Sequence, residues 1–302
     1  MNEEKKVIAL GFFDGVHRGH ATLLKKAAEI SEGLRATPAV LTFDVSPGRL
    51  VSGEKVELIT SPEERAEIIR RYFGIEEIIV LQFDHNLMHM RWRDFISWLV
   101  RDFSAVHFVV GYDFRFGYKG EGNSQKLAEK CAELGLGCDV MPQVAIDGIR
   151  VSSTYIRELL SKGDMEKARE FLGHPHSLTD IVRFGYKLGS KMGSPTINMK
   201  FPENVLVPAH GVYATTVQIE DEEKIHYAVT NIGVRPTVRD ESEASVESVE
   251  SYILDFNKNI YGKRVRLEFH KMLRPEKKFK SVEELKEQIK KDAHEVRKYF
   301  KL

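Results

Sequence analysis

Hydrophobic and polar positions follow two different patterns along the chain, and the change comes shortly after residue 150. In the first half, helical segments alternate with short aliphatic and β-branched runs, at residues 7–10, 39–43, 78–81, 107–110 and 139–141. Nearly continuous apolar runs of this kind are typical of strands buried on both faces of a parallel sheet. Five of them separated by helices predict a doubly wound, Rossmann-like α/β domain, with its working crevice at the carboxyl ends of the strands.

After about residue 175 the pattern alternates with period two, strictly at residues 265–269 and more loosely at 212–217. Turn residues separate these runs, so we expect antiparallel strands with one solvated face, closed into a small barrel. Ser61 and Glu64, with Pro62 at the first helical position, form a capping box that opens a helix in the first half. A second capping box, of Ser281 and Glu284, opens a final helix that continues to about Phe300.

Two short helical segments, residues 155–160 and 165–172, connect the halves, and the second ends at Gly173. We therefore place the domain boundary at this glycine. The expected domains are residues 1–173, with the linking helices, and residues 174–302.

Composition describes a soluble globular protein, since 42% of the residues are hydrophobic and 30% are charged. The formal net charge is zero, which argues against nucleic acid or a membrane surface as a partner. No apolar run approaches the roughly 18 to 20 residues needed to cross a bilayer, and no secretory signal is visible. Cys131 and Cys138 are expected to be a reduced pair, so we predict a cytoplasmic protein.

A loop that carries candidate chemistry follows the first predicted strand, at residues 11–20. Its glycines let the backbone approach a phosphate closely, and the helix that follows offers free N–H groups at its positive end. His17 and His20 can donate hydrogen bonds to phosphoryl oxygens from this loop. A plain strand-to-helix turn with two surface histidines is the alternative, and the combination with Asp14 favours the phosphate site.

A second candidate segment, residues 150–157, follows the fifth predicted strand. The hydroxyls of Ser153 and Thr154 can cap a helix and can also hold a triphosphate. Arg157, one turn later, has a planar fork that suits phosphate. Taken alone, this segment would be an ordinary helix cap with a surface arginine.

The second half lacks the Gly-x-x-x-x-Gly-Lys-Ser/Thr motif, so it is not a Walker-type kinase. It does contain a loop at residues 187–198 with glycines and lysines that can lie over a triphosphate. Thr196 and Asn198 supply side-chain oxygens of the type that Mg²⁺ accepts. Taken alone, the segment is a loop that leads into a strand.

The sequences of three segments, residues 11–20, 111–117 and 150–157, resemble those in the N-terminal module of bacterial bifunctional riboflavin kinase/FAD synthetases. The resemblance implies transfer of AMP from ATP to FMN with release of pyrophosphate, and phosphate stabilisation by His17 and His20. The ATP-binding residues that it implies are Gly11, Phe13, Asp14, Gly15, Gly19, Ser153, Thr154 and Arg157. On the flavin side it implies Asp113, Arg115 and Phe116.

The second half resembles the riboflavin kinase module of the same family, through residues 187–198, 211–213, 231–237, 250–256 and 273–276 in the expected order. This implies a six-stranded antiparallel barrel, ATP bound with Mg²⁺ by Thr196 and Asn198, and Glu250 as the general base for the ribityl 5′-hydroxyl. The further residues that it implies are Gly189, Gly193 and Pro195 for ATP and Arg274 and Glu276 for flavin. Without the resemblance, Glu250 would be an exposed strand carboxylate.

The expected substrates are therefore riboflavin, FMN and ATP with Mg²⁺, with no tightly bound prosthetic group, and self-association is left open. One departure concerns residues 43–47, which read Phe-Asp-Val-Ser-Pro where the family usually has Phe-Asp-Pro-His-Pro. A riboflavin kinase with impaired adenylyl transfer is therefore one alternative. A non-catalytic flavin-binding protein is another, and the intact motifs of both halves argue against it.

Overall fold

The computed structural model of the protein describes residues 4–46, 56–184, 196–235 and 246–302. Contacts divide the chain into two compact units, Met1–Ser153 and Thr154–Leu302, which are described separately below. This division lies earlier than residue 173 and groups both linking helices with the C-terminal unit. The sequence-based boundary stays a prediction.

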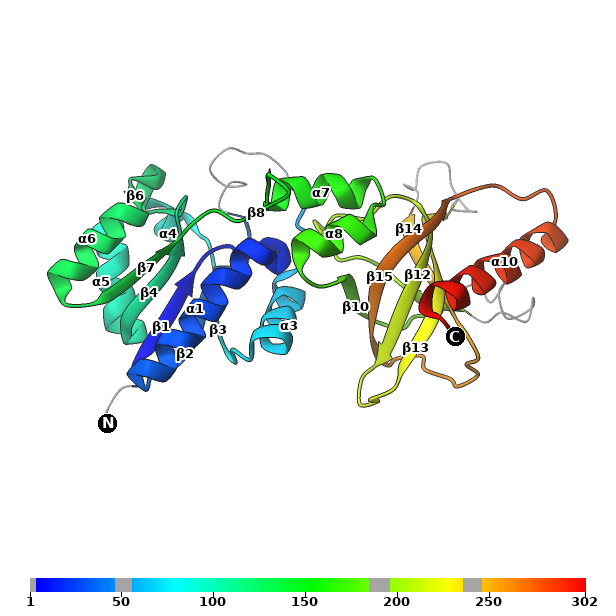
Figure 1. Ribbon diagram of the computed structural model, residues 1–302, viewed down its shortest axis with the longest axis horizontal. Helices are drawn as coiled ribbons and strands as arrows, with labels where there is room; N and C mark the ends of the chain where they lie inside the picture. The colour runs from blue at the N-terminus through cyan, green and yellow to red at the C-terminus, as the bar shows by residue number, and fades with distance from the viewer. Residues whose placement is uncertain (1–3, 47–55, 185–195, 236–245) are drawn as a thin grey trace. The chain divides into compact units, whose positions relative to one another are not determined.

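A five-stranded parallel sheet forms the centre of the N-terminal unit, in the order β3-β2-β1-β4-β7 (Figure 1). This order confirms the predicted doubly wound domain. Its strands are β1 (Lys6–Leu10), β2 (Thr37–Phe43), β3 (Glu77–Leu81), β4 (Ala105–Gly111) and β7 (Gly137–Met141). The main helices are α1 (Arg18–Leu34), α3 (Pro62–Phe73), α5 (Trp92–Phe103) and α6 (Ser124–Leu134). Smaller elements are η1 (Asp14–Val16), α4 (His85–His89), β5 (Arg115–Phe116), η2 (Tyr118–Gly120), β6 (Gly122–Asn123), β8 (Ala145–Ile146) and β9 (Ile149–Arg150).

Alternate residues of the central strand β1 enter two separate hydrophobic cores. Val7 and Ala9 pack with apolar residues of α1 and α3 on one face of the sheet. Ile8 and Leu10 pack with α5 and α6 on the other face. Because both faces of β1 are covered, this central strand can be apolar from Val7 to Leu10, as the sequence pattern predicts.

The helix α3 begins at the capping box that the sequence predicts. The Ser61 hydroxyl accepts a hydrogen bond of 3.1 Å from the Glu64 N–H, and Pro62 occupies the first turn. Gly74, with φ of 65°, ends the helix in the left-handed conformation that glycine adopts without strain.

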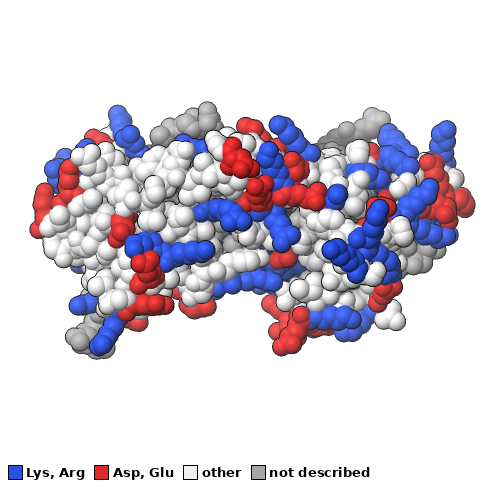
Figure 2. Space-filling view, viewed as in Figure 1, with Lys and Arg blue, Asp and Glu red and all other residues white. Residues whose placement is uncertain are grey.

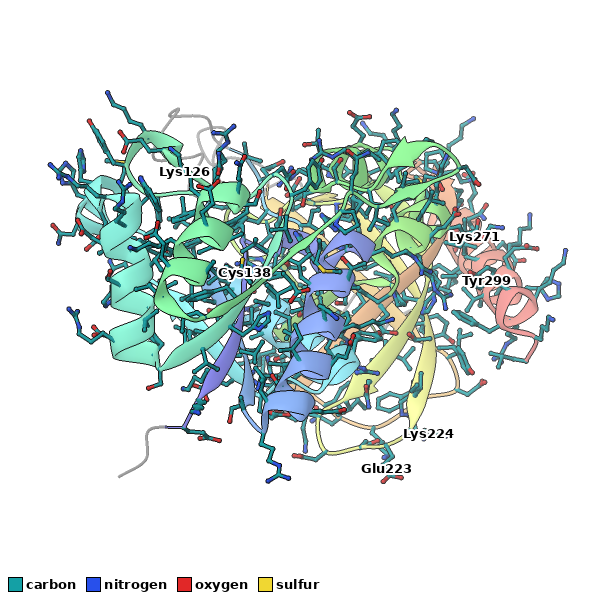
Figure 3. All side chains as sticks on the ribbon, turned by 60° about the vertical axis from the view of Figure 1, so that its left-hand side comes forward. Lys126, Cys138, Glu223, Lys224, Lys271 and Tyr299 are labelled. Atoms are coloured by element: carbon teal, nitrogen blue, oxygen red, sulfur yellow. The ribbon has the colours of Figure 1, made fainter. Side chains whose placement is uncertain are left out.

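The C-terminal unit is an antiparallel sheet of six strands in the order β10-β15-β12-β13-β14-β11, curled into a barrel. The Arg183 N–H donates to the Asn198 carbonyl over 2.9 Å, which joins the chain after β10 to β11. The strands are β10 (His176–Ile181), β11 (Thr196–Met199), β12 (Gly211–Ile219), β13 (Ile225–Arg235), β14 (Val246–Ile253) and β15 (Arg264–Pro275). The helices are α7 (Ser153–Ser161), which begins at the last residue of the other unit, α8 (Met165–Leu172) and α10 (Val282–Phe300). The predicted turn between β12 and β13 carries Glu223 and Lys224 at its tip (Figure 3).

Successive residues of the barrel strands point to opposite faces, and the two faces differ. One face holds a ladder of buried hydroxyls, in which Thr230 bonds Thr215 and Ser251 over 2.7 Å each. The opposite face packs against α10, whose Val296 contacts Val212 and its neighbours. Figure 3 shows Lys271 of β15 beside Tyr299 of α10, with the ammonium 5.7 Å from the ring centroid.

The surface carries both signs of charge. On the face shown in Figure 2, Lys and Arg side chains intermingle with Asp and Glu, which agrees with a net charge of zero. In the part of the chain that the structure describes, every helix is too short or too polar to span a bilayer.

Candidate active sites

A cleft of about 380 Å³ opens in the N-terminal unit where β1, β4 and β7 end. This is the position that the doubly wound topology predicts for a ligand site. The predicted residues that line it are Gly11, His17, Gly19, His20, Asp113, Arg115 and Ser153. The structure thus brings together three segments that lie far apart in the sequence.

His17 and His20 form a stacked pair at the start of α1. Their ring centroids lie 3.6 Å apart, and the His20 N–H donates to His17 Nδ1 over 3.2 Å. A neutral His17 therefore carries its proton on Nε2. Burial, followed by the charges of His17 and Arg65, lowers the pKa of His20 well below 6.5. A neutral imidazole at the positive end of a helix can donate one N–H to a phosphoryl oxygen.

Three residues of the first loop that are predicted to bind ATP do not line the cleft. Phe13 is fully buried in the core, and Asp14 is 2% exposed. Asp14 Oδ1 accepts hydrogen bonds from the backbone N–H groups of Ile59, over 2.9 Å, and Thr60, over 3.1 Å. A Cβ atom on Gly15, at φ of 76°, would lie 3.0 Å from the Ile59 side chain. These residues hold the loop in shape, and their contact with ATP stays a prediction.

The predicted flavin residues behave differently from one another. Asp113 lies in the cleft wall, where its Oδ2 pairs with Arg150 Nη2 over 2.5 Å. Arg150 also lines the cleft, and its guanidinium lies 5.5 Å from the Tyr112 ring centroid. Phe116 is 8% exposed and belongs to the hydrophobic core behind the wall. Of the motif at residues 113–117, only the first three residues reach the ligand space.

Ser153 ties the far wall to the loop, because its hydroxyl donates to the Asp14 carbonyl over 3.0 Å. Thr154 and Arg157 follow on α7 but belong to the C-terminal unit. Their predicted contact with the triphosphate stays a prediction.

Arg65 is a functional candidate that the sequence did not reveal. Its fully buried guanidinium donates to Thr42 Oγ1 over 2.8 Å and to the Phe43 carbonyl over 3.0 Å. It also lies 4.3 Å from the centroid of Phe12, which lines the cleft. Burial lowers the pKa of Arg65 to about 10, so the side chain keeps its positive charge at neutral pH. Within an amphipathic helix such as α3, no local signal marks this residue.

The register of the barrel brings the predicted kinase residues together. Asn198 of β11 lies directly opposite Glu250 of β14, and Thr196 shares the face of Asn198 because it lies two residues earlier. Directly opposite residues have Cβ atoms about 4.5–5.5 Å apart, within reach of one ligand. Asn198 is 8% exposed, which places its amide in a largely desolvated position.

Glu276 lies close to this row, whereas Arg274 is engaged elsewhere. A Cβ atom on Gly233 would lie 2.2 Å from Glu276 Oε1 and 3.0 Å from Asn231 Nδ2, so both side chains cover that glycine. Arg274 Nε and Nη2 donate to Asp292 of α10, the shortest bond being 2.8 Å. The predicted flavin residue Arg274 therefore fastens α10 to the barrel.

A second cavity, of about 430 Å³, opens beside Thr196 and is bordered by the loop at residues 256–261. The Tyr261 ring in this loop stacks on Phe184 with centroids 4.1 Å apart. Such a pair offers an aromatic platform of the kind on which a purine can stack. The predicted residues Gly189, Gly193 and Pro195 lie outside the described residues.

Comparison with known proteins assigns both units. A family model described as FAD synthetase matches residues 1–155, and one described as riboflavin kinase matches residues 172–300. A bifunctional riboflavin kinase/FMN adenylyltransferase of Bacillus subtilis is 34% identical over 99% of this chain and 93% of its own length. The corresponding protein of Escherichia coli K12 is 32% identical over 99% of this chain and 94% of its own.

The chain belongs to the bifunctional riboflavin kinase/FMN adenylyltransferase family. A similar fold occurs in a crystal structure described as a macrolide-efflux protein from Streptococcus pneumoniae. That chain has a TM-score of 0.84 and 27% identity, and the match covers 98% of this chain and 95% of the other. The predicted family, fold and domain types are confirmed. The roles of the individual site residues stay predictions.

Proposed function

We propose that the two reactions of FAD synthesis occur at two separate sites, one in each unit of the chain. As a bifunctional riboflavin kinase/FMN adenylyltransferase, the protein phosphorylates riboflavin to FMN and then adenylylates FMN to FAD. The observation that supports separate sites is that each unit has its own cavity, and each cavity lies beside the residues expected for one reaction. Kinases and adenylyltransferases of these kinds use ATP, generally with a divalent metal ion.

In the N-terminal cleft, a phosphate oxygen of FMN attacks the α-phosphorus of ATP. The bond from that phosphorus to the bridging oxygen breaks, and pyrophosphate leaves. His17 and His20 donate N–H groups to the phosphates beside the positive end of α1. Arg150, held by Asp113, adds a guanidinium to the lining of the cleft. Positioning and charge stabilisation suffice for this chemistry, so no covalent intermediate is required.

In the barrel, Glu250 accepts the proton of the ribityl 5′-hydroxyl while that oxygen attacks the γ-phosphorus, and ADP leaves. Thr196 and Asn198 fit a Mg²⁺ ion, because they present two neutral oxygens from one face of one strand. When bound with ATP, this ion would neutralise phosphate charge. Glu250 lies directly opposite Asn198, so the base and the nucleotide are held by adjacent strands.

We also propose a cytoplasmic location. Its support is the use of ATP and the two free thiols, Cys131 in the core and Cys138 partly exposed. Self-association is left open.

The two-site proposal is tested by separating flavins after incubation of the protein with riboflavin, ATP and Mg²⁺. Glu250→Ala should lower FMN formation by a factor of about 10²–10⁴, typical for loss of a general base, while FAD formation from supplied FMN survives. His20→Ala should do the opposite. Either substitution abolishing both reactions in folded protein would contradict two separate sites. FMN that accumulates without FAD in the parent chain would favour the kinase-only alternative raised by Val45 and Ser46.

A further inference from the structure

Asn231 lies in the barrel beside the expected site residues, but none of the predicted roles includes it. It lies directly opposite Glu250, which in turn lies opposite Asn198, so the three form one row across β13, β14 and β11. Directly opposite residues in antiparallel strands project from the same face. The face is the one on which the proposed general base and the proposed metal ligand lie.

Glu276 approaches Asn231 from the other side of β13. The position of a Cβ on Gly233 lies 2.2 Å from Glu276 Oε1 and 3.0 Å from Asn231 Nδ2. Gly233 shares the face of Asn231 because it lies two residues further along the strand. Only a residue without a side chain leaves room for the Glu276 carboxylate there. The Asn231 amide thus has one carboxylate opposite it on β14 and a second beside it.

An amide is well suited to this place because of its hydrogen-bonding groups. The NH₂ group of asparagine has two N–H donors, so it can donate one to each carboxylate. Asparagine is otherwise depleted in strands, and β13 is a central strand with β12 and β14 on its two sides.

We propose that Asn231 is a positioning residue of the riboflavin kinase reaction. Its amide orients the Glu250 carboxylate toward the attacking hydroxyl and the Glu276 carboxylate toward neighbouring hydroxyls of the substrate's polyol chain. The inference rests on the proposed function, since it takes Glu250 as the base of that site.

The experiment compares kcat and the KM for ATP in FMN formation by the parent chain, Asn231→Ala and Asn231→Asp. The alanine variant should lose about tenfold in kcat with the KM for ATP unchanged, as for loss of one oriented hydrogen bond at a catalytic carboxylate. The aspartate variant keeps the shape of the side chain but has no N–H donor, so its kcat should fall at least as far. Glu247→Gln, on the same strand and partnered with His210, is the control and should match the parent.

FAD formation from supplied FMN reports on the other unit in the same samples and should be unchanged, while circular dichroism reports on the folding of the barrel. The inference is overturned if both Asn231 variants keep the kcat of the parent. It is also overturned if both lose the two reactions together, which indicates a structural role. Should neither variant fold, Gly233→Ala decides: displacement of Glu276 should raise the KM for riboflavin but not for ATP, and an unchanged KM refutes the inference. A parent chain that forms no FMN refutes the proposed function instead.

Discussion

Replacing Asp14 by alanine should destabilise the N-terminal unit, because this carboxylate holds the cleft loop to the segment before α3. Asp14 Oδ1 accepts two backbone hydrogen bonds, from Ile59 and Thr60, and all three residues are at most 3% exposed. The Gly15 N–H donates to Thr60 Oγ1 over 3.0 Å and completes the clamp. Alanine would leave the two N–H groups buried without an acceptor from residue 14.

The magnitude follows from these contacts. A hydrogen bond to a charged group contributes about 1.5–3 kcal/mol, so two give about 3–6 kcal/mol. Partial relaxation of the loop favours the lower end, and we expect the free energy of unfolding to fall by about 3 kcal/mol. Asp14→Asn keeps an acceptor oxygen and should cost only about 1–2 kcal/mol, which makes it the matched control.

Tryptophan fluorescence is the appropriate assay, since the chain's two tryptophans, Trp92 and Trp98, both lie on α5 of the N-terminal unit. With a urea dependence of about 2 kcal/mol per molar, the midpoint for Asp14→Ala should fall by about 1.5 M. FMN formation, in the other unit, should be unaffected under native conditions. A midpoint within about 0.3 M of the parent, together with a tenfold higher KM for ATP in FAD formation, would show that Asp14 binds nucleotide directly and would refute the reasoning.

Two further predictions concern the C-terminal unit. Asp292→Asn should weaken the attachment of α10, because the buried carboxylate accepts hydrogen bonds from Arg274 and Gln288. We expect the free energy of unfolding to fall by about 2–3 kcal/mol, measured by urea unfolding followed by circular dichroism. No change would show that packing alone holds the helix. His176 is expected to make the barrel acid-sensitive. Burial, followed by the charges of His174 and Arg266, lowers the pKa of His176 to about 3. Below about pH 6.5 the unfolded chain therefore binds a proton at this histidine that the folded chain does not bind. Stability should therefore fall as the pH drops from about 6.5 toward 3, by about 2 kcal/mol at pH 5, and His176→Phe should remove that part of the loss. An unchanged pH dependence in the His176→Phe chain would contradict this assignment.

Local signals in the sequence were sufficient for the elements and the family. Strand and helix periodicity predicted both domain types, and the capping boxes at Ser61 and Ser281 begin helices as expected. Short motifs such as residues 11–20 identified the family, because each motif is a continuous piece of chain whose residue types are visible without the fold.

Which residue of a motif reaches a ligand was decided only by the tertiary structure. Within one loop, His17 lines the cleft while Asp14 turns inward to Ile59 and Thr60, which lie more than forty positions away. The resemblance predicts flavin contact for Arg274, and the structure adds that its guanidinium pairs with Asp292 on a helix formed later in the chain.

The row formed by Asn198, Glu250 and Asn231 shows the same limit most clearly. Periodicity shows that alternate residues of a strand share a face, but it does not show which residue of a distant strand lies opposite. That register depends on how three strands pair through backbone hydrogen bonds and on which faces are buried. The sequence alone therefore determined what kinds of side chain are available, and the pairing of strands decided which of them act together.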